Sequence, residues 1–403
     1  MNLSAELERW LPAPTRELLT LIGHCAAQKG YRACLVGGAV RDLLLGETSL
    51  DLDIVVEGDA LDVTRSLATS GGPAPVFHQR FGTATLVSGS FRVDLATARN
   101  ESYHRPGALP SVRPGSIEQD LLRRDFTMNA MAVRLGTERH GELVDPYGGR
   151  GDLQHGLLRV LHEASFKDDA TRMLRGVRYE QRLGFAFEKF TLALLTRELP
   201  YVKCISGDRL RHEIEHMLAE REPEQMLWRL GALGVLAAID ESLDFGPGQF
   251  EAFRRAKANR LTAARSELLF WCVLGWGLDK EGLASVATRL NLPGRLLGPM
   301  QDSFLLRVFE ADLDRPGLRP SDVVGLLCDK STASLSAAEL LYGRSLARSR
   351  VSLYLTRLRH IRPALDGRML RQLGFVEGPA IGSALARLRV ARLNGEVGSR
   401  EQE

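Results

Sequence analysis

The stretch that decides the fold reads Gly37-Gly38-Ala39-Val40-Arg41-Asp42, followed by Asp51-Leu52-Asp53. An apolar run from Tyr31 to Val36 precedes the two glycines, and the residues from Ala39 to Leu45 are apolar at helical spacing. This order predicts a strand, a tight turn and a helix. The residues from Asp51 to Val56 alternate and are rich in β-branched side chains, which predicts a second strand. We therefore expect the first third of the chain to be an α+β unit.

Asp51 and Asp53 place two carboxylates on one face of this second strand, because residues i and i+2 of a strand point the same way and lie about 6.5 to 7 Å apart. Like charges repel unless a cation or a proton lies between them, so the pair is costly as structure alone. A hairpin from Thr83 to Leu95 adds Asp94. Three acids on neighbouring strands can hold two divalent cations, which activate a hydroxyl and steady a leaving phosphate. We predict Asp51, Asp53 and Asp94 as catalytic residues, with a solvated turn position as the alternative for Asp94.

The Gly37-Gly38 turn lets a ligand approach the backbone closely, and its N–H groups open a helix whose positive end favours phosphate. Arg41, one turn further on, can add a charge-assisted contact. Together with the acidic strand, this turn predicts binding of a nucleoside triphosphate with magnesium. The sequence contains no GxxxxGK[ST] run, which disfavours a P-loop ATPase.

Composition excludes several classes of protein. The chain has 403 residues, which is enough for two or three domains. Its five cysteines lie far apart with no CxxC pair, so neither a disulfide framework nor a cysteine zinc site is supported, and a reducing compartment fits. No apolar run approaches the roughly 20 residues of a membrane helix. We expect a cytoplasmic protein without a membrane partner, and no protein partner is implied.

The net charge of +3 hides an uneven distribution. Between Arg344 and Arg400 there are twelve arginines and three acidic residues, which gives this segment +9 and leaves −6 for the rest of the chain. A coding bias that replaces Lys with Arg is the alternative explanation for most of the arginines in the chain. The planar guanidinium group also suits phosphate and base edges, so the C-terminal segment is a candidate RNA-binding region.

The middle of the chain changes character. Glu101 to Gly115 is rich in Pro, Gly and Ser and is expected to be a loop, and Ile117 to Val133 has a helical pattern. Beyond about Leu157 apolar residues recur at helical spacing and strands become hard to find. The rest of the chain is therefore expected to be all-helical.

Three further motifs follow in order: Arg123-Arg124-Asp125-Phe126-Thr127-Met128-Asn129-Ala130, Asp145-Pro146-Tyr147-Gly148-Gly149 and Asp168-Asp169-Ala170-Thr171-Arg172. With the glycine turn and the acidic strand, they resemble the class II tRNA nucleotidyltransferase and bacterial poly(A) polymerase family of the polymerase β superfamily. The resemblance implies an N-terminal nucleotidyltransferase head with a small mixed sheet, followed by helical neck, body and tail domains. We place these four domains at residues 1–155, 156–220, 221–340 and 341–403.

The resemblance also implies roles for individual residues. Asp51 and Asp53 would bind Mg²⁺, and Asp94 matches the third carboxylate position of the superfamily. Asp168 stands where the family usually has Glu, which leaves the role of that residue open. The residues expected to bind the incoming nucleotide are Gly37, Gly38, Arg41, Arg124, Asp169, Arg172, Arg175 and Arg178.

Asp169 and Arg172 can explain how nucleotides are selected. They stand three apart in a helical pattern and are expected to share a face, which Arg175 and Arg178 continue. A carboxylate only accepts hydrogen bonds and a guanidinium only donates them. Cytosine and adenine both present an amino donor beside a ring-nitrogen acceptor, whereas guanine and uracil present the reverse. One Asp and one Arg therefore accept C and A without a template. The alternative is an ordinary surface ion pair.

The C-terminal segment from Ala364 to Glu403 contains Gly378-Pro379, which is typical of a helix start with free N–H groups. The helix that follows carries the predicted RNA-binding residues Arg387, Arg389 and Arg392. A solvated amphipathic helix, with Leu385, Leu388 and Leu393 packed inward, is an equal alternative.

The expected reaction is attack of the tRNA 3′-hydroxyl on the α-phosphate of CTP or ATP, with pyrophosphate leaving and with C, A or CCA added. The resemblance associates a segment like Glu101 to Gly115 with members that add the final A. Three rivals remain: a poly(A) polymerase with the same head, a nucleotidyltransferase acting on a small molecule, and a non-catalytic RNA-binding protein. The basic tail disfavours the second, and the intact carboxylates disfavour the third.

Overall fold

The computed structural model describes residues 1–79, 82–136, 138–258 and 263–403. The chain forms two compact units. The first comprises Met1–Ser206 and Leu233–Val235, and the second comprises Gly207–Ala232 and Leu236–Glu403. Within the described ranges, no helix is long and apolar enough to cross a membrane.

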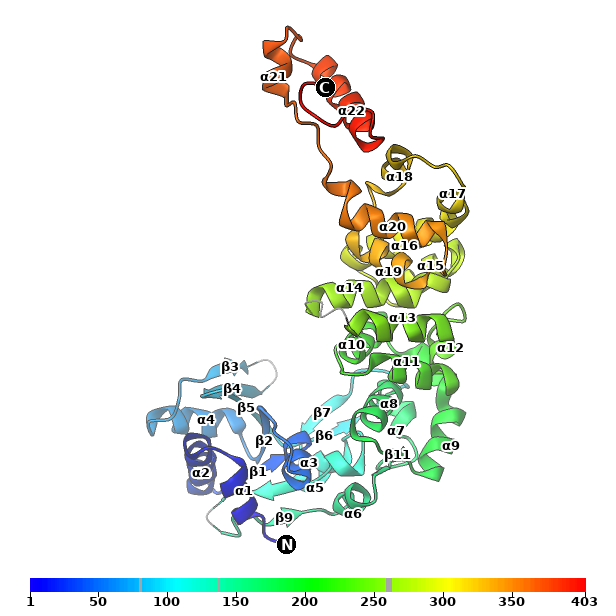
Figure 1. Ribbon diagram of the computed structural model, residues 1–403. Helices are drawn as coiled ribbons and strands as arrows, with labels where there is room; N and C mark the ends of the chain where they lie inside the picture. Colours follow the sequence, from blue (N-terminus) through cyan, green and yellow to red (C-terminus); the bar gives the residue numbers. More distant parts are fainter. Residues whose placement is uncertain (80–81, 137, 259–262) are drawn as a thin grey trace. The chain divides into compact units, whose positions relative to one another are not determined.

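The first unit is built on a mixed sheet, which the described residues form in the order β3-β4-β5-β2-β1-β8-β9 (Figure 1). Strands β2 and β5 are parallel, whereas the other neighbours are antiparallel. The strands are β1 Arg32–Val36, β2 Asp51–Glu57, β3 Val76–His78, β4 Thr83–Ser88, β5 Phe91–Thr97, β8 Ala132–Arg134 and β9 Leu143–Val144. This confirms the expected α+β class and the strands predicted around the glycine turn.

Helices cover this sheet and continue beyond it. Asp59 is the N-cap of helix α4, because its carboxylate accepts hydrogen bonds from the backbone N–H groups of Leu61 and Asp62. The helices of the first unit are α1 Ser4–Trp10, α2 Ala13–Gln28, α3 Gly38–Leu45, α4 Ala60–Thr69, α5 Ile117–Leu122, η2 Thr127–Asn129, α6 Gly149–Gln154, α7 Ser165–Asp168, α8 Thr171–Leu183, α9 Lys189–Glu198 and η3 Leu199–Cys204. Helices α2 and α4 contact each other and the sheet.

The helix predicted over Ile117 to Val133 is wrong beyond its first turns. A capping box between Ser116 and Gln119 starts α5, which ends at Leu122. The chain then forms η2 and the strand β8, whose Ala132 pairs with Val36 of β1. The apolar residues at the end of this segment therefore complete the sheet rather than a helix face.

The loop predicted over Glu101 to Gly115 is also wrong at both ends. Strands β6 Arg99–Ser102 and β7 Ser111–Pro114 form an antiparallel two-stranded sheet. The buried carboxylate of Glu101 accepts hydrogen bonds from Arg99, Arg123 and Tyr103, which fixes β6 beside α5. A short parallel pair, β10 Leu157–Leu158 and β11 Ala186–Phe187, was not predicted either.

The described part of the second unit is helical, as expected. Its elements are α10 Gly207–Leu218, α11 Pro223–Ala232, α12 Val235–Ile239, α13 Pro247–Ala258, α14 Ala263–Leu274, η4 Gly275–Gly277, α15 Lys280–Arg289, α16 Gly294–Val308, α17 Glu310–Asp314, α18 Pro320–Leu327, α19 Thr332–Leu341, α20 Leu346–Thr356, η5 Leu358–His360, α21 Gly367–Gln372 and α22 Pro379–Leu393. The finer division into neck, body and tail stays a prediction.

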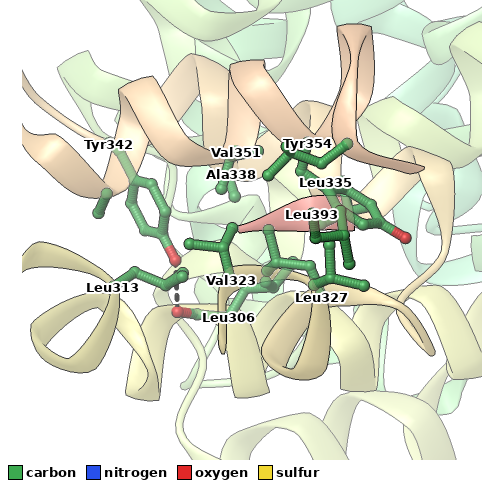
Figure 2. Packing of buried hydrophobic residues seen from close by; sticks show 13 residues of the cluster. Leu306, Leu313, Val323, Leu327, Leu335, Ala338, Tyr342, Val351, Tyr354 and Leu393 are labelled. Atoms are coloured by element: carbon green, nitrogen blue, oxygen red, sulfur yellow. Dashed lines mark hydrogen bonds between the residues drawn. The ribbon is translucent and has the colours of Figure 1, made fainter. Parts of the chain in front are cut away.

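One core of the second unit joins α16 to α20 (Figure 2). Leu306, Val323, Leu327 and Val351 pack together there, and the hydroxyl of Tyr342 donates a hydrogen bond to the carbonyl of Leu306. Leu393 at the end of α22 joins the same cluster. The prediction that Leu393 packs inward is thus correct, whereas Leu385 and Leu388 are only half-buried.

Candidate active site

Three predicted carboxylates lie on one face of the sheet. Asp51 and Asp53 alternate along β2, and Asp53 is the register partner of Asp94 on the parallel strand β5. The carboxylate of Asp94 accepts hydrogen bonds from Thr85 Oγ1 at 2.5 Å and from Arg92 Nε at 3.0 Å. The hairpin predicted over Thr83 to Leu95 therefore brings Asp94 to the pair on β2.

The electrostatics of Asp53 reflect this crowding. Its side chain reaches the surface. Partial desolvation and the charges of Asp94 and Asp51 nevertheless raise the pKa of its carboxyl above the ordinary value. The positive charges of Arg124 and Arg123 lower this pKa but do not offset the increase. Among the described residues, no three acidic, histidine or cysteine side chains already converge on one point as a metal site. The donor set nevertheless fits a hard divalent cation, because such cations prefer carboxylate oxygens and because a cation relieves this repulsion.

The glycine turn lies directly against a predicted nucleotide-binding arginine. Gly37 has φ of 74° and ψ of −134°, a conformation that favours glycine, and it precedes α3. A Cβ at position 37 would lie 2.5 Å from Nη1 of Arg124. A Cβ at position 38 would lie 3.5 Å from Nη2 of Arg41. The structure thus brings the turn, Arg41 and Arg124 together, and their binding of a nucleotide stays a prediction.

Arg124 is held on one side only. Its Nη2 donates to Asp120 Oδ2 at 3.1 Å, whereas its Nε is buried without a hydrogen-bond partner among the described residues. A buried donor without a partner costs free energy. Arg124 also lines a hollow of about 370 Å³ together with Asp53, Asp94, Arg99 and Arg123. This hollow therefore combines carboxylates for a cation with guanidinium groups for an anion.

Arg41 is buried, with 4% of its surface exposed. Its guanidinium donates to Asp42 Oδ1 at 2.7 and 2.9 Å and to Asn129 Oδ1 at 2.8 Å. Asn129 in turn donates to Asp125 Oδ1 at 3.0 Å. Arg41 is thus fixed between the glycine helix and η2, so it lies beneath the turn rather than in the open hollow.

Tyr179 was not singled out from the sequence, although it lies at the centre of the predicted arginines. Its buried ring has four guanidinium carbons within 5.4 to 5.8 Å, those of Arg41, Arg175, Arg178 and Arg182. Arg175 also donates to the carboxylate of Asp125 at 2.6 and 3.0 Å. Two features of the sequence could have indicated these residues. One is the motif that contains Asp125 and Asn129, and the other is the regular spacing of arginines on either side of Tyr179.

The predicted base-reading pair lies at the start of α8, but not on one helical face. Asp169 precedes the helix in extended backbone, and its carboxylate accepts hydrogen bonds from the N–H and hydroxyl of Thr171. Arg172 is buried and donates to Ser165 Oγ and to the carbonyl of Arg123, both at 2.7 Å. The helix begins only at Thr171, with Ala170 as its N-cap, so Asp169 lies outside the helical face on which it was expected. The two residues remain one turn apart, with the N–H of Arg172 bonded to the carbonyl of Asp169.

The three predicted RNA-binding arginines of α22 belong to the second unit and differ in their surroundings. Arg387 is exposed, whereas Arg392 is paired with Glu403 at 2.7 Å. Arg389 is half-buried, and its Nε has no partner among the described residues. Of the three, Arg387 is the one whose side chain is most open to an RNA.

Comparisons with known proteins agree with this geometry. The model of the poly A polymerase head domain matches residues 33–159. The chain is 34% identical to an A-adding tRNA nucleotidyltransferase from Geobacter sulfurreducens, over 98% of this chain and 47% of that protein. It is also 34% identical to a CC-adding tRNA nucleotidyltransferase from Deinococcus radiodurans, over 92% of this chain and 87% of that protein. The chain thus spans about half the length of the first of these relatives and most of the second.

A solved structure extends the likeness to the whole fold. The Thermotoga maritima CCA-adding enzyme complexed with tRNA superposes with a TM-score of 0.80 at 29% identity, covering 100% of this chain and 97% of that one. The likeness includes both units, so it is not confined to the head domain.

Proposed function

Because the chain belongs to the tRNA nucleotidyltransferase family, with a head domain of the poly A polymerase type, we propose that it adds nucleotides to the 3′ end of tRNA. It transfers CMP, AMP or both from CTP and ATP without a nucleic-acid template and releases pyrophosphate. The observation that carries this proposal is the pairing of Asp53 with Asp94 in register, beside the Gly37 turn and the guanidinium of Arg124 that lies against it.

The triphosphate binds where anion-binding groups meet. The start of α3 behind the Gly37-Gly38 turn favours a phosphate, and the guanidinium of Arg124, which lies against that turn, donates to a phosphate oxygen. Arg41 holds the turn in place through Asp42 and Asn129. The arginines around Tyr179 add positive charge near the same turn.

The carboxylates hold Mg²⁺ and the attacking hydroxyl. Asp51 and Asp53 supply the ligands, and the bound cation supplies Lewis acidity at the α-phosphate. Asp94, fixed by Thr85 and Arg92, accepts the proton of the RNA 3′-hydroxyl as the hydroxyl attacks that phosphate. Pyrophosphate then leaves past the arginines that line the hollow.

Asp169 and Arg172 select the base. Asp169 accepts from the amino group shared by cytosine and adenine, and Arg172 donates to the adjacent ring nitrogen. The contacts of Asp169 with Thr171, and of Arg172 with Ser165 and Arg123, restrict both side chains. A restricted pair loses little conformational entropy when it binds the base.

One assay tests the proposal. The full chain is offered tRNA ending before CCA, tRNA ending in CC and unstructured RNA, each with one nucleotide at a time, and the products are sized. We expect extension of at least one tRNA with C or A and none with G or U. A long A tract on unstructured RNA would identify a poly(A) polymerase instead, and no extension of any RNA would refute nucleotidyl transfer.

A further inference from the structure

Two buried carboxylates lie behind the arginines that line the hollow. Asp120 on α5 is only 1% exposed, and the side chain of Glu101 on β6 is 6% exposed. The two elements contact each other in the first unit (Figure 1). Acidic side chains are rarely buried unless they are paired. The partners of Asp120 and Glu101 therefore show what the buried charges do.

Asp120 holds two neighbouring arginines at once. Its Oδ1 accepts hydrogen bonds from Nε and Nη2 of Arg123 at 3.0 and 2.8 Å, and from the backbone N–H of Arg99 at 3.3 Å. Its Oδ2 accepts a hydrogen bond from Nη2 of Arg124 at 3.1 Å. Both carboxylate oxygens are occupied, so one buried charge fixes the guanidinium groups of two consecutive residues.

Glu101 holds Arg123 at a second point. Its Oε1 accepts hydrogen bonds from Nη1 of Arg123 at 3.3 Å and from Nε of Arg99 at 3.0 Å. Arg99, Arg123 and Arg124 all line the hollow. Three guanidinium groups thus face two carboxylates, which leaves this cluster one formal positive charge. That charge favours an anion in the hollow.

Arg123 and Arg124 also join the two parts of the proposed nucleotide site. The carbonyl of Arg123 accepts a hydrogen bond at 2.7 Å from Nη2 of Arg172, the predicted base-reading arginine. The guanidinium of Arg124 lies against the turn, with Nη1 2.5 Å from the place of a Cβ on Gly37. The carbonyl of Arg123 and the N–H of Arg124 belong to one planar peptide group. A single rigid group therefore links the contact of Arg172 to the arginine beside the turn.

We propose that Asp120 is a positioning residue that couples base selection to triphosphate binding. This inference rests on the proposed function, because it takes Arg172 as the group that meets the base and Arg124 as the group that meets a phosphate. Asp120 is buried and acts only through Arg123 and Arg124. Loss of its charge releases both guanidinium groups, so the hold on the phosphate and the placing of Arg172 weaken together. A purely structural ion pair would affect stability and leave the selection of nucleotides unchanged.

The test is the steady-state kinetics of the full chain on one tRNA with each of the four nucleoside triphosphates. Asp120→Asn keeps the shape of the side chain but removes its charge and one acceptor. We expect the KM for the preferred nucleotide to rise by about tenfold or more, because a hydrogen bond to a charged group is lost. The preference in kcat/KM over GTP and UTP should fall by about tenfold as well.

Two further variants show how Asp120 acts. In Asp120→Asn with Arg124→Gln, the KM should stay within about threefold of that of Arg124→Gln alone, because residues that act through each other are not additive. If Asp120→Asn is unfolded by circular dichroism, Arg123→Lys replaces it. Lysine keeps the charge but lacks the planar fork that meets both Asp120 and Glu101, so the same loss of selection is expected.

The matched control is Glu118→Gln. Glu118 is an exposed acid on the same helix α5, so its replacement should leave the KM and the selection of nucleotides near wild type. A folded Asp120→Asn variant with wild-type selection, or a KM effect that adds fully to that of Arg124→Gln, would overturn the inference alone. A wild-type chain that extends no tRNA would refute the proposed function, which separates the two failures.

Discussion

Asp53 on β2 and Asp94 on β5 are register partners in the parallel strand pair of the mixed sheet. Asp51 lies two residues before Asp53, on the same face. Desolvation, together with the charges of Asp94 and Asp51, raises the pKa of Asp53, so its ionised form costs free energy unless a cation is bound. The same arrangement is suited to holding Mg²⁺ against a triphosphate.

Asp53→Asn should therefore raise the melting temperature when divalent cations are removed by EDTA, because one of the repelling charges is gone. Mg²⁺ should raise the melting temperature of the wild type and have little effect on the variant; a ligand at 100 times its Kd contributes about 2.7 kcal/mol. Asp59→Ala is the contrasting variant. It removes the cap of α4 and should cost about 1 kcal/mol while preserving the Mg²⁺ effect. An Asp53→Asn variant as responsive to Mg²⁺ as the wild type would contradict the metal assignment.

Gly37→Ala should impair triphosphate binding. Alanine at this backbone conformation costs about 1 to 3 kcal/mol, and its Cβ would displace Arg124. We expect the KM for ATP or CTP to rise by tenfold or more. Gly46→Ala is the matched control, since Gly46 also has positive φ but no atom within 4 Å of the added Cβ. Equal kinetic effects of the two substitutions would show that Arg124 is not involved.

Asp169→Ala should relax base selection. Without the carboxylate, the amino group of cytosine or adenine loses its acceptor, so the preference for C and A over G and U should fall by about tenfold or more. The measurement is kcat/KM for each of the four nucleoside triphosphates on one tRNA. If discrimination against GTP and UTP stays the same, the account of the Asp and Arg pair is wrong.

Asp125→Asn should destabilise the first unit in a pH-dependent way. Burial alone raises the pKa of Asp125, but Arg175, the hydrogen bond from Asn129 and the charge of Arg172 more than offset it and lower the pKa to about 2. A lowered pKa stabilises the fold above the unfolded value of about 3.9, and this stability is lost as the pH falls toward 2.

The expected loss for Asp125→Asn is about 2 kcal/mol at pH 7, measured by urea unfolding, and it should shrink between pH 4 and 2. Asp322→Asn is the control, because Asp322 pairs with Arg319 at the surface and its loss should be nearly neutral. A loss that stays constant down to pH 2 would mean that the Asp125 charge does not stabilise the fold.

The local pattern of the sequence was enough for the elements around the glycine turn. Asp51 to Val56 and the hairpin up to Leu95 follow their alternation, and α8 follows its helical spacing. The local pattern could not predict the end of the segment from Ile117 to Val133, because Ala132 pairs with Val36 of the distant strand β1. Pairing between distant strands leaves no signal in a short window.

Partners distant in sequence also explain what was missed in the site. Arg41 donates a hydrogen bond to Asn129, which is 88 residues away in the sequence. Arg175 donates to Asp125, which is 50 residues away. In the same way, Arg392 in α22 pairs with Glu403, a partner that the sequence did not indicate, and its contact with RNA stays a prediction. Residue type indicated the chemistry, but only the fold shows which groups are already satisfied.

The most direct test of the central claim is the incorporation of labelled AMP or CMP into tRNAs ending in CC and before CCA, by the wild type and by Asp53→Asn under the same conditions. We predict incorporation by the wild type with at least one of these tRNAs, and a rate lower by at least about 10²- to 10³-fold in the variant, because the stabilisation of charge at the α-phosphate is lost. Undiminished incorporation by Asp53→Asn, or none by the wild type with either tRNA, would contradict the account.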